Sequence, residues 1–138
     1  MKLRITLLSL SLVLSSTALF GEEDTPLEKQ MQILARGMKQ LSVQISDPSK
    51  NQDSVALIES LKQAAGISKE LKPRKTASIP QADQEQFLTA YKAQIAKLSD
   101  AFSQIEEAIK AGKNDQAKTV LATIGPIKKE GHSKFKQD

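Results

Sequence analysis

The chain has 138 residues, of which 39% are hydrophobic and 26% are charged, values typical of one folded domain. It contains no cysteine and a single histidine, His132. These counts exclude disulfides, thiolate zinc sites, iron–sulfur clusters, covalent c-type haem attachment and any metal site built from several histidines. Aromatic residues make up 4% of the chain and tryptophan is absent, which argues against a nucleic-acid surface that stacks bases.

The N-terminal segment has the pattern of a secretory signal peptide. Two basic residues precede an apolar run, Leu7 to Leu14, and small residues follow it. The run is shorter than the about 20 residues that span a bilayer, although an uncleaved N-terminal anchor is the alternative. Cleavage after Ala18 or after Gly21 fits the pattern. We therefore predict an exported protein with a signal peptide over residues 1–21 and one domain over residues 22–138.

Removal of this segment lowers the net charge. It takes Lys2 and Arg4 from the 20 basic residues and none of the 16 acidic ones, which leaves a mature chain of charge +2. We therefore expect no nucleic-acid partner, and no stable membrane association after signal cleavage. The sequence shows no Ser/His/Asp set, no pair of acids on one helix face and no phosphate-binding loop, so we do not expect an enzyme.

The first predicted helix begins at a capping box. Thr25 is a suitable N-cap, Pro26 is tolerated at the first helical position and Glu28 stands at the third. Apolar residues then recur every three or four positions, as a helix that packs on other helices requires: Leu27, Met31, Leu34, Met38, Leu41 and Ile45. The helix is expected to end before Pro48.

The second and third helices are predicted over about Asp53–Lys72 and Gln81–Ala111. Small residues in the middle of the second helix, Ala64 to Gly66, would allow a neighbouring helix to approach closely. The third helix carries apolar residues at helical spacing: Leu88, Tyr91, Ile95, Leu98, Phe102, Ile105 and Ile109.

The fourth helix is predicted to follow a stop signal at Gly112, with Asn114 as its N-cap and Asp115 as its first residue. Pro126 falls inside this helix and is expected to kink it. Short connections favour antiparallel neighbours, so we predict an all-α, up-down-up-down antiparallel four-helix bundle that is a monomer. An extended helical adaptor that oligomerises is the alternative.

Two short strings give the bundle a family resemblance. Leu27-Glu28-Lys29-Gln30-Met31 stands near the start of the first helix, and Gly131-His132-Ser133-Lys134-Phe135-Lys136 stands at the end of the chain. A Leu-Glu-x-x-Met opening and a terminal His-x-Lys-aromatic-basic ending resemble the cytochrome b562 family. The resemblance covers essentially all of the mature chain, and the Gly112-Lys113 turn before the last helix also fits it.

This resemblance implies a soluble periplasmic electron-transfer protein that holds one non-covalent b-type haem. The haem iron would lie between Met31 and His132, and electrons would pass to a redox partner protein that the sequence does not identify. A haem-free bundle that serves as a binding or scaffold protein of the cell envelope is the alternative function.

Helix geometry gives an independent check on the pair. Met31 lies about five residues inside its helix, roughly 7–8 Å from the end, and His132 lies about six residues from the C-terminus at a similar height. Met38 is one heptad further along, about 10 Å away, which is too far to share an iron with His132. The expected apolar walls of the site are Leu27, Leu34, Phe87 and Tyr91. Lys128, together with Arg74 or Lys75, could meet the haem propionates.

Overall fold

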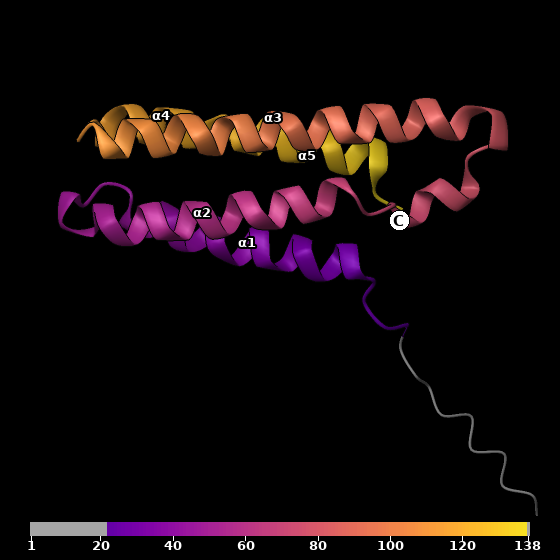
Figure 1. Ribbon diagram of the computed structural model, residues 1–138, viewed down its shortest axis with the longest axis horizontal. Coiled ribbons are helices and arrows are strands. Elements are labelled where there is room, and N and C mark those ends of the chain that lie inside the picture. The colour runs from indigo at the N-terminus through magenta and orange to yellow at the C-terminus, as the bar shows by residue number, and fades with distance from the viewer. Residues whose placement is uncertain (1–21, 138) are drawn as a thin grey trace, which may run out of the picture.

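A computed structural model of the chain describes residues 22–137 (Figure 1), so the predicted signal peptide lies outside the described residues. Five α-helices make up most of this region: α1 (Pro26–Gln44), α2 (Asn51–Lys69), α3 (Gln84–Lys110), α4 (Asn114–Ala122) and α5 (Ile124–Phe135). Three short 3₁₀ turns join them: η1 (Pro48–Lys50), η2 (Arg74–Ser78) and η3 (Gln81–Asp83). Because α4 and α5 together form the fourth helix, the predicted all-α four-helix bundle is confirmed.

The helices form two layers. α1 packs beside α2 in one layer, and α3 packs beside α4 and α5 in the other, while α2 and α3 join the layers (Figure 1). α1 and α5, by contrast, are not closely packed along their backbones. The antiparallel order brings the start of α1, the end of α2, the start of α3 and the end of α5 to one end of the bundle.

α1 begins with the capping box that the sequence predicts. The backbone N–H of Thr25 donates to Glu28 Oε2 at 2.6 Å, and the backbone N–H of Glu28 donates to Thr25 Oγ1 at 3.2 Å. Two of the N–H groups that a helix start leaves without an internal partner are thus satisfied, and Pro26 at the first position has none to satisfy. This fixes where α1 starts and hence the height of Met31.

The core is built from apolar residues of every helix, and at Gly37 the backbone of α1 lies directly against a core side chain of α2. A Cβ atom added to Gly37 would lie 2.5 Å from Leu61 Cδ2, so α1 meets α2 at a distance that only glycine permits. The expectation that Gly66 would serve this purpose is wrong, because Gly66 is exposed and an added Cβ there would meet nothing within 4 Å. Ala64 and Ala65, its neighbours, are buried as expected.

The turn between α3 and α4 is set by Gly112, which has a φ of +72°. The backbone N–H of Lys113 reaches back to Ala108 O at 2.8 Å, which ends α3 in the manner of a Schellman motif. The prediction that Asn114 caps α4 is wrong: Asn114 is the first residue of α4 and its amide makes no capping bond. Instead the amide donates to Ile45 O at 2.8 Å, because that buried carbonyl at the end of α1 needs a partner.

The fourth helix is interrupted at Thr123, as the proline predicts. Pro126 has no N–H with which to continue the helical bonding to Ala122, and the next bond, from Ile127 N–H to Thr123 O, is long at 3.5 Å. α5 is therefore a separate helix of 12 residues, and its position depends on what holds it to α3.

Candidate functional site

Met31 and His132 lie at the same end of the bundle. Met31 is five residues after the first residue of α1, and His132 is three residues before the last residue of α5. At 1.5 Å per residue these positions correspond to about 7.5 Å and about 4.5 Å from the respective helix ends. The two helices that carry these residues, α1 and α5, are not closely packed along their backbones.

Met31 lies on the core side of α1. It is half-buried and packs against the core between Leu27, which is half-buried, and Leu34, which is buried. Met38 is half-buried on the same side of the helix, one heptad nearer the opposite end. The two methionines therefore have similar surroundings and differ in height.

His132 is exposed in the last turn of α5, and its backbone carbonyl accepts the N–H of Lys136 at 3.1 Å. The pKa of its imidazole lies below the usual value, first because protein atoms around the ring desolvate it, and then because of the charges of Lys128 and Lys136. The neutral imidazole is the form that can bind a metal, so these surroundings favour the form that ligation needs.

Three aromatic rings pack together at this end. Phe135 makes edge contacts with Phe87, at a centroid distance of 5.3 Å and an angle of 63°, and with Tyr91, at 5.6 Å and 71°. The Tyr91 hydroxyl donates to Ser68 O at 2.6 Å, and burial raises the pKa of this phenol well above its usual range. The predicted wall residues Phe87 and Tyr91 thus lie together, and Phe135 joins them.

Gln94 holds α5 against α3. Its side chain is buried, and its Nε2 donates to Ile127 O at 2.8 Å and to Glu130 Oε2 at 3.2 Å. Gly131 lies against the same side chain, since an added Cβ would be 3.4 Å from Gln94 Cγ. This contact sets the position of the turn that carries His132.

Arg74 joins the α2–α3 connection to the start of α1. Its Nε donates to Glu28 Oε1 at 2.8 Å, its NH2 group donates to Glu28 Oε2 at 3.0 Å and to Glu23 O at 2.9 Å, and it also pairs with Glu22. The guanidinium is the main reason why the pKa of Glu28 falls to about 2. Arg74 is thus occupied by acidic groups, and of the basic residues considered for propionates, Lys75 is half-buried and Lys128 is exposed.

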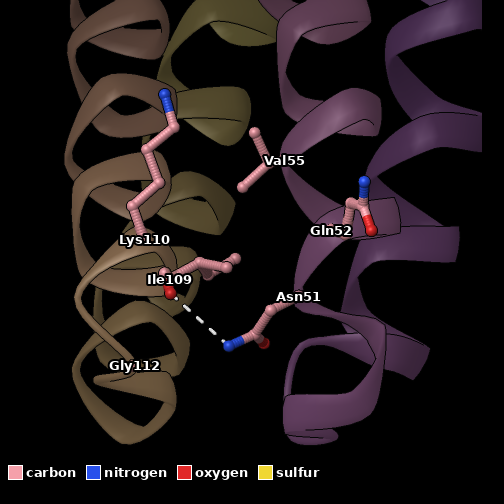
Figure 2. Close-up of a pocket in the computed structure, with 6 residues that line it drawn as sticks. All are labelled: Asn51, Gln52, Val55, Ile109, Lys110 and Gly112. Carbon is pink, nitrogen blue, oxygen red and sulfur yellow. Dashed lines mark hydrogen bonds between the residues drawn. The ribbon is translucent and has the colours of Figure 1, made fainter.

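The opposite end of the bundle contains a cavity of about 360 Å³ lined by Asn51, Gln52, Val55, Ile109, Lys110 and Gly112 (Figure 2). The Asn51 amide donates to Ile109 O at 3.4 Å, as Figure 2 shows, and exchanges hydrogen bonds of 3.2 and 2.7 Å with the amide of Asn114. This arrangement ties three helices together far from Met31 and His132. The cavity is therefore not part of the candidate site.

A family model, Cytochrome b562, matches residues 26–136. The chain belongs to the cytochrome b562 family. Members of this family are haem-binding electron-transfer cytochromes rather than typical enzymes. The comparisons with curated proteins and with solved structures find no match. In residues 22–137, no helix is long and apolar enough to cross a membrane.

The residues at the Met31 end fit the b-type haem that membership of the cytochrome b562 family implies. A thioether and an imidazole are a known axial pair for haem iron, and here they come from two helices without close backbone packing. Leu27 and Leu34 flank Met31 on α1, and Phe87 and Tyr91 of α3 pack on Phe135 of α5 at the same end, which supplies the apolar side chains that a flat apolar ring requires. Over the same described residues no group of three or more His, Cys, Asp or Glu could hold a metal ion, and a haem iron needs no such group.

The sequence did not reveal the contacts that three residues make at this end of the bundle: Phe135, Gln94 and Arg74. Phe135 was part of the terminal string, and its position three residues after His132 indicates that it lies near the histidine. Gln94 is a polar residue on the apolar stripe of α3, which is the only local signal that it has a buried partner. Arg74 gave no sign that it pairs with Glu28, 46 residues earlier in the chain.

Proposed function

We propose that the protein is a periplasmic electron carrier that holds one b-type haem with Met31 and His132 as the axial ligands. The observation that carries this proposal is the pair of donors at one end of the bundle in a member of the cytochrome b562 family. A bound haem would supply a one-electron couple between ferrous and ferric iron.

The two donors define what kind of haem protein this would be. The His132 imidazole, with its lowered pKa, offers a neutral nitrogen near pH 7. The Met31 thioether is a soft donor that favours ferrous iron and so raises the reduction potential. If both donors bound the iron, oxygen and peroxide would have no open position, which would suit an electron carrier rather than an oxygen activator.

The surrounding residues have three roles in this proposal. Leu27, Leu34, Phe87 and Tyr91, all part of or packed on the apolar core, would exclude water from a bound porphyrin. Gln94 positions the last turn of α5 and thereby His132. Lys128, exposed one turn before His132, is available to pair with a carboxylate of the haem edge.

Titration of the mature protein with hemin tests this function. We expect saturation at one hemin per chain, with a sharp Soret band and narrow α and β bands after reduction, as a six-coordinate low-spin iron gives. A protein whose spectrum remains that of free hemin throughout the titration would contradict the proposal.

The same titration tests the second candidate, a haem-free bundle that acts as a binding or scaffold protein of the cell envelope. The exposure of His132 and the mutual packing of Phe87, Tyr91 and Phe135 favour this candidate, because the aromatic rings already cover one another. A mixture that shows only the spectrum of free hemin, and a protein that is colourless once unbound hemin is removed, would support it.

Periplasmic export is part of the proposal and has its own test. If a signal peptide is cleaved after Ala18 or after Gly21, the intact mass of the protein recovered from cells should correspond to a chain that begins at Leu19 or at Glu22. Recovery of a chain that begins at Met1 in the membrane fraction would contradict cleavage.

A further inference from the structure

The 3₁₀ turn η2 covers the end of the bundle where Met31 lies. In a 3₁₀ turn, residues three apart share a side. Arg74 and Ala77 occupy the outer side, where they line a cavity of about 650 Å³ together with Glu28 of α1 and Gln137 beyond α5. η2 therefore lies between the start of α1, which carries Met31, and the end of α5, which carries His132.

The other side of η2 faces the protein interior. It carries Thr76, which is buried, as is Pro73, the residue that precedes η2 and lies three positions before Thr76. Thr76 is 6% exposed, and among residues 22–137 its Oγ1 is the one buried side-chain polar atom without a hydrogen-bond partner. A buried hydroxyl that lacks a partner destabilises the fold, so a native protein that keeps one has a reason to do so.

The chemistry of the expected cofactor identifies a partner for this hydroxyl. The pyrrole nitrogens of a haem are bound to iron, so its acceptors for a strong hydrogen bond are the two propionate carboxylates. A hydroxyl that donates to a carboxylate makes a charge-assisted hydrogen bond, one of the stronger kinds. Arg74, a cation on the outer side of η2, is already bound to Glu28 and Glu22.

We propose that Thr76 is a haem-binding residue whose hydroxyl donates a hydrogen bond to a haem propionate. The inference rests on the proposed function, since it concerns the same haem. It predicts that the hydroxyl has opposite effects on the two forms of the protein: it destabilises the haem-free chain, where it has no partner, and it strengthens haem binding.

The substitution Thr76→Val removes the hydroxyl and keeps the shape of the side chain. In the mature haem-free protein, we expect it to raise the urea midpoint of unfolding, measured by circular dichroism. In an absorption titration with hemin, we expect it to weaken binding about tenfold, the loss that corresponds to one hydrogen bond to a charged group. Thr76→Ser, which keeps the hydroxyl, should bind hemin more tightly than Thr76→Val. Thr89→Val, an exposed control on α3, should change neither quantity.

The results separate the inference from the proposed function. If the unmodified protein binds hemin and Thr76→Val binds it equally tightly, the Thr76 inference is wrong and the proposed function stands. A lower urea midpoint for Thr76→Val would also overturn the inference, because the hydroxyl would then have a partner without haem. If the unmodified protein does not bind hemin, the proposed function fails and the inference fails with it.

Discussion

The replacement of Gly37 by alanine should destabilise the protein through a single packing contact. An added Cβ would lie 2.5 Å from Leu61 Cδ2 and 3.2 Å from Leu61 Cγ, so the whole isobutyl group must move. Leu61 is 1% exposed and has no room to turn toward solvent, so we expect an overpacking cost of about 1–3 kcal/mol. The gain in helix propensity from glycine to alanine, about 1 kcal/mol, offsets part of this cost.

Gly66→Ala is the matched control, because the same chemical change falls in the neighbouring helix where the added Cβ meets nothing within 4 Å. It should raise the free energy of unfolding by about 1 kcal/mol. Since the propensity term cancels between the two variants, urea unfolding of both should give a difference of about 1–3 kcal/mol, which measures the overpacking at Gly37. Variants of equal stability, within about 0.5 kcal/mol, would refute the close approach of α1 and α2.

Three further predictions concern polar contacts and the helix break. Because the pKa of Glu28 is lowered to about 2, its ion pair with Arg74 stabilises the fold above about pH 4.5, and this stabilisation is lost as the pH falls toward about 2. In a plot of unfolding free energy against pH, Arg74→Ala should therefore flatten the curve over this range. The variants Asn51→Ala and Asn114→Ala should each lower the free energy of unfolding by about 1–3 kcal/mol, because each removes a partner of the other amide. A double-mutant cycle should give a coupling of about 0.5–3 kcal/mol, and additive losses would show that the two amides do not interact. Pro126→Ala should leave hemin binding intact with a small change in spectrum or affinity, whereas complete loss of hemin would show that the interruption positions the histidine.

The parts of the fold that the sequence predicts are those with local causes. The capping box of Thr25 and Glu28 needs only residues three apart, and the turn at Gly112 needs only a backbone that permits a positive φ. Helical spacing of apolar residues likewise identifies the buried faces. For this reason the four helices and their antiparallel order follow from the chain alone.

The parts that were missed depend on contacts between distant segments. Gly37 and Gly66 both lie within helices, and only the packing of α1 on α2 decides which of them is buried. Asn114 has the composition of a helix cap, but a carbonyl 69 residues earlier in the chain competes for its amide. At the candidate site, Met31 and His132 could be identified from the two short sequence strings that contain them. Gln94 and Thr76 could be recognised only once their burial was known.

The ferrous absorption spectrum of hemin-loaded Met31→Ala, compared with that of Met38→Leu, tests the ligation of haem most directly. Met31→Ala should lose the narrow bands of six-coordinate low-spin iron and have a lower reduction potential, because the thioether that favours ferrous iron is gone. Met38→Leu, a core substitution that nearly conserves volume, should cost under about 1.5 kcal/mol of stability and keep the spectrum of the parent protein. If Met38→Leu loses the low-spin bands while Met31→Ala keeps them, or if neither variant changes the spectrum, Met31 is not the ligand.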